Sequence, residues 1–386
     1  MINSRKAVWA APVVVAAAIG AIIAYAGPAT ASPDLPSVTP EQLIANVAGA
    51  DVTAFSGNVT VKSNIGLPDL SSLESIFGMQ ANGLVSLLTG TTNVKVAVDP
   101  KVGARAEIDS GTSAYVAVAN ESSGDAWLYS SASNSATHIT GASAPSDTAT
   151  ATVPTPQTIA DQAISAITPS TSLSVAANTT VAGRPAYTLV LKPSDAGSVI
   201  SEVDLFVDAT TWFPLGAQVW STQSSAAALD VAFTSITYNA PAASLFSFTP
   251  PSGTAIQNMD MSSSDKTGTA TSGQTQPASP TTKVVAGQGW ASVVEISGLP
   301  SQITDALADP STLASSLSQS SGSGHGRGGM GGVGSLNQLI GSLVQQTAQG
   351  TLYSTYLGAL LVTPSGHVFA GAVPASAVQA AAQANP

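Results

Sequence analysis

The chain contains no cysteine, and this absence alone removes several kinds of site. Without cysteine there can be no disulfide framework, no thiolate nucleophile and no cysteine-ligated zinc or iron–sulfur centre. The lipid-bearing cysteine of a lipoprotein is excluded for the same reason. Charged residues are scarce too, at 9% of the sequence against 44% hydrophobic residues. A surface so poor in charge must meet water through Ser, Thr, Asn and Gln, which indicates a protein outside the cytoplasm.

Patterns that carry catalysis or hold a cofactor are also missing. The sequence has no G-x-S-x-G, H-E-x-x-H, P-loop or EF-hand pattern. A metal site needs several convergent donors, and none of His138, His325 and His367 lies at helical spacing from another ligand-type residue. One G-x-G-x-x-G match begins at Gly324, but Gly/Ser filler surrounds it instead of a strand and a helix. We therefore expect a protein that is not an enzyme and has no cofactor and no metal.

Negative charge outweighs positive charge, and the formal net charge is −11. Such a chain, without a cluster of Lys or Arg, does not suit a nucleic-acid partner. It also repels an anionic membrane surface, so any link to a membrane needs an anchor or an apolar contact.

The N-terminus has the pattern of an export signal. Arg5 and Lys6 precede an uncharged, largely apolar run from Ala7 to Ala26, and Ala29-Thr30-Ala31 fits an A-x-A cleavage site. Cleavage after Ala31 would remove two basic residues and no acidic one, which changes the net charge from −11 to −13. An uncleaved anchor is the alternative, because about twenty apolar residues can just span a bilayer. In either case we expect an extracytoplasmic protein, secreted or anchored to the cytoplasmic membrane.

Short alternating strands dominate the chain after one N-terminal helix. Thr39-Pro40-Glu41-Gln42 predicts the helix start, with a Thr cap, Pro at the first position and Gln42 at the capping-box position. Period-2 alternation between Gly, Ser, Asn and Asp clusters then predicts an antiparallel meander. Its expected strands are 55–65, 94–98, 105–108, 114–118, 126–129, 136–139, 186–191, 201–208, 215–222 and 229–238.

Helical spacing interrupts this meander twice, at 67–88 and 158–167, and the first of these excursions could be a lid. Towards the C-terminus we expect a strand at 290–296, helices at 303–317 and 336–343, and a hairpin formed by 356–363 and 367–373. The expected fold class is therefore α+β.

Composition divides the chain into segments. Residues 262–283 form a linker rich in Ser, Thr and Pro, and the Gly-rich loop 319–334 is nearly pure Gly and Ser, so both are expected to be disordered. The expected organisation is a signal peptide or anchor at 1–31, a β-rich core at 32–261, the linker at 262–283, strands and helices that complete the sheet at 284–373, and a frayed tail at 374–386.

Aromatic residues fall in or beside the predicted strands, and most of them are expected to pack in an ordinary core. Some could instead line a cavity, since a curved sheet with helical lids is a natural way to enclose an apolar ligand. The candidate ligand-binding residues are Trp127, Tyr129, Phe206, Trp212, Trp220 and Phe233.

Several motifs resemble the actinobacterial LolA-like family. Asp125-Ala126-Trp127-Leu128-Tyr129, followed by Ala136-Thr137-His138, is similar to a strand pair of that family. The most specific stretch is Val181-Ala182-Gly183-Arg184-Pro185-Ala186-Tyr187. The run from Val203 to Asp208, followed by Pro214-Leu215, fits the family's strand–turn pattern. The resemblance spans residues 39–373 apart from the low-complexity inserts.

The resemblance implies a half-open, curved antiparallel sheet, an incomplete barrel with a helical lid across its mouth. Relatives with this fold carry lipoprotein acyl chains or glycolipids, and the RseB/MucB group binds an anti-sigma factor and senses lipid. The excursion at 67–88, the linker and the Gly-rich loop enlarge the minimal carrier. The fold alone therefore fixes neither the ligand nor the partner.

Three functions stay open. A carrier or sensor of a lipid or lipoprotein acyl chain predicts a dry tunnel of several hundred Å³ under the lid. A regulator similar to RseB/MucB, bound to an anti-sigma or other membrane partner protein, predicts an exposed apolar patch or a free sheet edge. A structural surface protein without ligand predicts a filled barrel.

Overall fold

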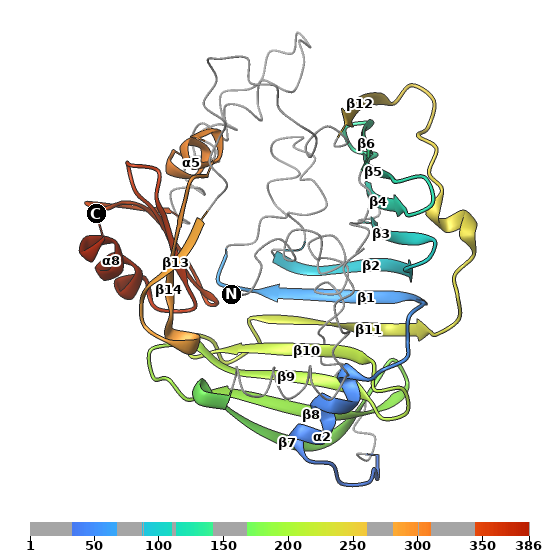
Figure 1. The fold of residues 1–386 in the computed structure, drawn as a ribbon, viewed down its shortest axis with the longest axis horizontal. Helices are drawn as coiled ribbons and strands as arrows, with labels where there is room; N and C mark the ends of the chain where they lie inside the picture. Colours follow the sequence, from blue (N-terminus) through green and yellow to red (C-terminus); the bar gives the residue numbers. More distant parts are fainter. Residues whose placement is uncertain are drawn as a thin grey trace, which may run out of the picture.

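The computed structural model describes residues 33–67, 87, 89–109, 113–141, 168–260, 281–299, 301–309 and 344–385 of the chain. Two open β-sheets contain most of these residues (Figure 1). The larger sheet has twelve strands in the order β12-β6-β5-β4-β3-β2-β1-β11-β10-β9-β8-β7, and the smaller has six in the order β13-β14-β18-β17-β16-β15. Neighbouring strands are antiparallel except β12, which runs parallel to β6.

The strands of the larger sheet follow the predicted meander and add two that the alternation pattern did not reveal, β7 and β12. They are β1 (Phe55–Asn64), β2 (Thr89–Asp99), β3 (Gly103–Asp109), β4 (Ala114–Asn120), β5 (Asp125–Ser130), β6 (Ser135–Thr140), β7 (Thr171–Val181), β8 (Arg184–Pro193), β9 (Ile200–Asp208), β10 (Pro214–Ser221), β11 (Leu229–Thr237) and β12 (Ala255–Asp260).

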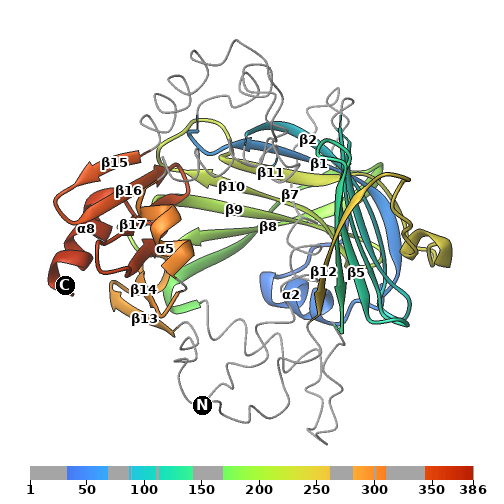
Figure 2. The ribbon, with the colours of Figure 1, turned by 90° about the horizontal axis from the view of Figure 1, so that it is seen from above.

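Alternation along the strands gives this sheet one apolar face. In β1, Val59 and Val61 are buried, whereas Thr60 and Lys62 point to the other side. Val59 lies opposite Val94 of β2, and Val94 lies opposite Ile108 of β3, so the apolar row continues from strand to strand. The sheet curves around this face (Figure 2), which we call the inner face. The expected half-open, mainly antiparallel sheet is confirmed.

One helix, α2 (Pro40–Ala48), lies on the inner face (Figure 2). It begins as the sequence predicts, because the Thr39 side chain accepts a hydrogen bond from the Gln42 amide while the Gln42 side chain accepts one from the Thr39 amide. Its Leu43 is fully buried against Tyr187 and Val207. The helix is thereby fixed across one end of the curved sheet.

The outer face is covered near β3 and β4 by the short 3-10 helix η3 (Ala243–Phe246). Arg105 donates a hydrogen bond to the Leu245 carbonyl (3.4 Å), and Asn120 donates one to the Phe246 carbonyl (3.3 Å). The Phe246 side chain is buried. Two further 3-10 turns are η2 (Thr168–Ser170) and η4 (Gly289–Ala291).

The C-terminal strands form the second sheet and do not complete the first one, so this part of the expected organisation was wrong. Local alternation predicts a strand but not the strand it pairs with, and here the pairs are all internal to 281–371. The elements are β13 (Thr281–Ala286), β14 (Val293–Ser297), α5 (Ser301–Ala308), β15 (Val344–Thr347), β16 (Gly350–Thr355), β17 (Gly358–Val362), β18 (Val368–Gly371) and α8 (Ala375–Ala384).

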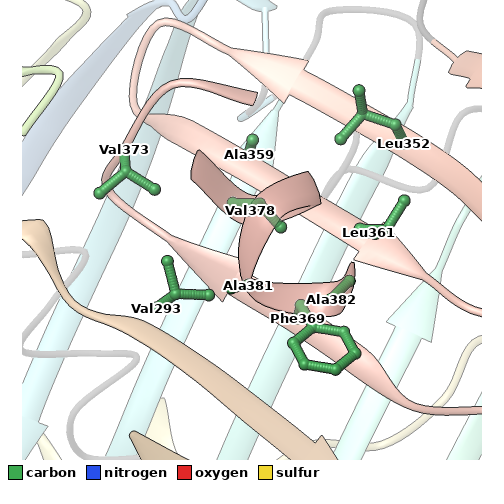
Figure 3. Close-up of a cluster of buried hydrophobic side chains, with 9 residues drawn as sticks. All are labelled: Val293, Leu352, Ala359, Leu361, Phe369, Val373, Val378, Ala381 and Ala382. Carbon is green, nitrogen blue, oxygen red and sulfur yellow. The ribbon is translucent and has the colours of Figure 1, made fainter. Parts of the chain in front are cut away.

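The tail also differs from the expectation of a frayed end. Residues 375–384 form α8, and Val378, Ala381 and Ala382 are buried against the second sheet beside Leu361 and Phe369 (Figure 3). Alanine has the highest helix propensity, and the spacing of these three residues places them on one face. The Ala-rich composition therefore describes a closely packed helix.

Hydrogen bonds join the second sheet to the ends of β1, β9 and β10. The Tyr356 amide donates to the Ile65 carbonyl (2.7 Å), the Val199 amide to the Ala372 carbonyl (2.8 Å), and the Ser221 hydroxyl to the Tyr356 carbonyl (2.6 Å). A side chain at Gly66 would come within 2.9 Å of the Tyr356 ring. The second sheet is thus attached at one set of strand ends of the first.

Several expectations lie outside the described residues. These are the N-terminal segment 1–31, the excursion at 68–86, the helices at 158–167 and 336–343, most of the linker and the Gly-rich loop. Within the described ranges, no helix has the length and apolar character needed to cross a bilayer.

Candidate binding clefts around Trp212

Two open clefts share Trp212 as a wall. The smaller has a volume of about 370 Å³ and lies between residues 49–54 and the Thr210–Trp212 turn, with Tyr238 beside it. The larger has a volume of about 640 Å³ and lies between α2, residues 35–38, Tyr187 and Ala209. Both volumes fall within the range of small-molecule sites. Both clefts are open to solvent; the dry tunnel that a carrier predicts would lie under a lid at 67–88, most of which is outside the described residues.

The turn between β9 and β10 holds Trp212 in an uncommon backbone conformation. Its φ angle is +59°, in the left-handed region that bulky residues rarely adopt. The Trp212 amide donates to the Asp208 carbonyl (2.9 Å), and the Asp208 amide donates to the Phe213 carbonyl (2.9 Å). Such a conformation persists only where surrounding contacts determine it, and it often marks a functional position.

Asp208 supplies most of these contacts. Only 1% of this residue is exposed, and its carboxylate accepts hydrogen bonds from the amides of Thr210 (2.8 Å) and Thr211 (3.1 Å). It also accepts from the Tyr238 hydroxyl (2.9 Å) and pairs with the Arg184 guanidinium, which lies 4.8 Å from the Tyr238 ring centre. Arg184 ties the turn to β8 and Tyr238 ties it to the end of β11, while the amides of Thr210 and Thr211 fix the turn itself.

Ionisation of this cluster follows from the same geometry. Burial alone would raise the pKa of Asp208, but the Arg184 guanidinium and the two amide donors hold that pKa below its usual value. Burial, together with the Asp208 charge, raises the pKa of Tyr238 to about 12. At neutral pH Asp208 is therefore charged and Tyr238 is a neutral donor.

Tyr187 and an N-terminal strap complete the larger cleft. The Tyr187 ring stacks on Trp212 with centroids 5.6 Å apart and an interplanar angle of 6°. Its hydroxyl donates to the Pro36 carbonyl (3.0 Å). We call residues 33–38 the strap, and Asn178 of β7 holds its other end by donating to the Pro33 carbonyl (3.1 Å). Leu35 and Val38 of the strap add apolar walls.

Charge at the clefts is sparse and of one sign. Glu41 lines the larger cleft and Asp51 lines the smaller, and no Lys or Arg lines either one. Hydrogen bonds from its own backbone amide and from Thr39 keep the pKa of Glu41 below its usual value. The negative charges of Glu41 and Asp51 beside the apolar walls disfavour anionic ligands.

Most of the aromatic residues singled out from the sequence lie elsewhere. Trp127 and Tyr129 pack on the outer face with Phe248, at centroid distances of 5.9 and 5.5 Å. Phe206 and Trp220 also point outward, and Trp220 donates to Asp204 (2.9 Å). Phe233 points inward but is buried in the core, 3% exposed. Of the six, only Trp212 lines a described cleft, because four of the others point to the outer face and Phe233 is buried in the core.

Two of the cleft walls carry no sequence signal of their own. The strap and the loop at 49–54 are irregular segments without alternation or a motif. Tyr187 belongs to the stretch that carries the family resemblance. The charged turn residue Asp208 could be suspected from its place directly after a strand.

The histidines give no sign of a metal or catalytic site in the described part of the chain. His138 stacks on Trp127 (4.0 Å) and lies 3.5 Å from Asp125, and His367 lies 2.6 Å from Glu295. No group of three His, Asp or Glu side chains that could hold a metal ion occurs among the described residues.

Comparisons with known proteins give remote likenesses. No protein-family model matches the chain, and no curated protein matches it. The solved complex of MucA and MucB from Pseudomonas aeruginosa is 14% identical, with a TM-score of 0.40, over 89% of this chain and 96% of the other. A LolA superfamily protein from Nitrosomonas europaea is 12% identical, with a TM-score of 0.20, over 55% and 99%.

A third match is a conserved protein from Thermus thermophilus, 11% identical, with a TM-score of 0.32, over 56% of this chain and 98% of that one. LolA-like and MucB proteins are thus among the structures that this chain is similar to. Likenesses of this degree say nothing about a ligand, so function has to be argued from the clefts themselves.

Proposed function

We propose that this chain is an exported, non-enzymatic protein that binds an apolar ligand, such as a lipid or lipoprotein acyl chain, in the clefts beside Trp212. The observation that carries the proposal is the half-buried Trp212 ring, held rigid between two clefts of ligand size. A flat apolar side chain fixed in place offers binding surface without an entropic cost at the moment of binding.

The charges at the clefts narrow the ligand class. Glu41 and Asp51 repel a free carboxylate or phosphate, so a neutral acyl ester or the acyl chain of a lipoprotein suits the site better than a fatty-acid anion. The strap begins two residues after the expected cleavage site at Ala31, so on this proposal cleavage would leave the clefts beside the new N-terminus.

The first test is native mass spectrometry of the chain purified from its own host, followed by solvent extraction. We expect a co-purifying lipid of defined mass. A fluorescent monoacylglycerol then measures binding, and Trp212→Ala should weaken it by about tenfold or more. Trp127→Ala is the matched control, because Trp127 is also half-buried but lies on the outer face.

Two outcomes count against the proposal. A chain that is free of lipid and does not bind the probe favours a structural surface protein. Equal losses in Trp212→Ala and Trp127→Ala mean that binding does not take place in these clefts.

A second candidate is a regulator that binds a membrane or other partner protein. The observation that favours it is the exposed strand β12 at the end of the larger sheet, where Ile256 and Met259 are 50% and 53% exposed. The two candidates use different parts of the molecule and can be tested separately.

A further inference from the structure

The four strands that end the two sheets are β7, β12, β13 and β15, and three of them carry protection against further pairing. Natural sheet edges are usually blunted by bulges, Lys or Pro residues, short length or a cover. The register of β7 shifts between Ala176 and Thr179, and the strap is bonded to Asn178. β13 carries Lys283 and a register shift after Val284, and β15 has only four residues.

β12 has no bulge, and its one charged residue, Asp260, stands at its end. Its six residues, AIQNMD, contain no Lys, Arg or Pro, and its pairing with β6 is continuous from Ala255 opposite Ser135 to Asp260 opposite Thr140. All six residues are exposed. Among the described residues, no strand pairs with its outer edge. The outer edge therefore presents backbone donors and acceptors ready for another strand.

The edge of β12 that pairs with β6 shows how this end of the sheet accepts a strand. β12 follows β6 by more than a hundred residues in sequence and joins it through the backbone ladder, without burying its own side chains. Its start is fixed by the Asn134 side chain, which donates to the Gly253 carbonyl (3.0 Å), and by the Ala255 amide, which donates to the Asn134 carbonyl (3.0 Å).

The apolar residues of β12 define what a partner strand must carry. Ile256 lies beside Ala136 on the outer face, and Met259 lies beside Ile139 on the inner face. They are three positions apart, so they point to opposite faces. A partner strand that matches both must also place apolar residues three positions apart.

A second copy of this chain does not meet that requirement. Twofold antiparallel pairing that uses five residues of β12 places Ile256 opposite either Asn258 or Asp260 of the copy, since directly opposite residues share a face. Met259 then lies opposite Ala255 or Gln257. Self-pairing thus leaves Ile256 opposite a polar side chain in both registers.

We propose that the outer edge of β12 binds an extended segment of a different protein by strand addition, and that this segment carries apolar residues at positions i and i+3. The backbone of β12 supplies the hydrogen bonds to the added strand, while Ile256 and Met259 select the sequence of the partner segment. This inference gives a site to the second candidate function, and it stands or falls independently of the clefts at Trp212.

The test uses two labelled peptides of equal composition, KTVTSVTK and KTVSVTTK, whose valines lie three and two positions apart. We expect the first to bind the full chain, held in detergent, about threefold to tenfold more tightly, because only it matches both apolar residues. Hydrogen exchange should slow within residues 255–260 when it binds.

The double variant Ile256→Ser/Met259→Ser should lose this preference. Leu245→Ser is the matched control, because Leu245 is also an exposed apolar residue (40%) but lies on η3. Equal affinity for the two peptides, no binding, or protection outside 255–260 would overturn the proposal. Concentration-dependent dimers that the double variant abolishes would also overturn it, since the occupant would then be a second copy.

Discussion

The two ends of the twelve-stranded sheet are finished in different ways. At the β7 end, a bulge, the strap, helix α2 and the buried Asp208 cluster all close the structure around Trp212. At the β12 end, six exposed residues pair with β6, and no second strand adjoins them within the part of the chain that the structure describes. The difference teaches that the sheet is fixed by many contacts beside the clefts, whereas at β12 backbone groups can still pair.

The comparison predicts that substitutions at the β7 end lower the free energy of unfolding strongly and that substitutions at the β12 end lower it little. Asp208→Ala should have the largest effect, about 2–4 kcal/mol of the free energy of unfolding, because Arg184, Tyr238 and two amides lose their acceptor. Urea denaturation at neutral pH measures it. Glu121→Ala, an exposed turn residue, is the control, and equal losses in both variants would contradict the role given to Asp208.

The second-largest effect on stability is expected in α2, the helix on the inner face. Leu43→Ala removes a fully buried side chain and should lower the free energy of unfolding by about 2–4 kcal/mol. Leu43→Met conserves volume and should cost less than about 1.5 kcal/mol. Thermal unfolding of both variants, followed by tryptophan fluorescence, checks the difference. If the two variants unfolded together, α2 would not depend on this contact.

Asp204, on the outer side of β9, should respond to pH in the opposite sense to Asp208. Burial raises the pKa of Asp204 to about 6, with Glu202 adding to the rise, while a hydrogen bond from Trp220 and the charge of Lys192 lower it. A carboxyl whose folded pKa is raised adds stability below its usual pKa near 4, and this is lost as the pH rises through about 6.

Asp204→Asn should therefore stabilise the chain at pH 8, by about 1–2 kcal/mol, and make no difference at pH 4. The side-chain carbonyl of Asn can still accept from Trp220. Denaturation series at the two pH values provide the measurement. A gain that is the same at both would show that titration of Asp204 is not the cause.

Loss of the N-cap of α2, also at the β7 end, should have a smaller effect on the free energy of unfolding. Thr39→Ala removes the side-chain acceptor for the Gln42 amide and should cost about 1 kcal/mol, whereas Thr39→Ser should keep most of the stability. Urea denaturation compares the two, and a full loss in the Ser variant would mean that the hydroxyl is not what matters.

The smallest effect is expected at the β12 end. Ile256→Ser should change the free energy of unfolding by less than about 0.5 kcal/mol, since half of the side chain is already exposed. A loss as large as that of Leu43→Ala would show that β12 is packed after all, and the contrast between the two ends would fail.

The sequence predicts the parts of this fold whose signals are local. The capping box at Thr39 and Gln42 marks the start of α2, and alternation locates strands such as β1 and β9. β7 was missed because its bulge breaks the alternation between Ala176 and Thr179. The separate second sheet was missed because strand pairing is set by contacts between residues far apart in sequence.

The site was harder to predict than the fold. Trp212 was identified as a candidate because it is aromatic, but nothing in the sequence distinguishes it from Trp220, which points to the other face. The difference arises from the turn that Asp208 fixes and from register, since a shift of one residue moves a side chain to the opposite face. The strap and the loop at 49–54 become cleft walls only once the chain has folded around them.

The β9–β10 hairpin connects the clefts with the second sheet. Its base is bonded to that sheet through Val199 and Ser221, and its tip carries Trp212. With nine residues in β9, the two ends lie about 30 Å apart. The hairpin is therefore one continuous element that the second sheet holds at its base and whose tip forms the wall that the two clefts share.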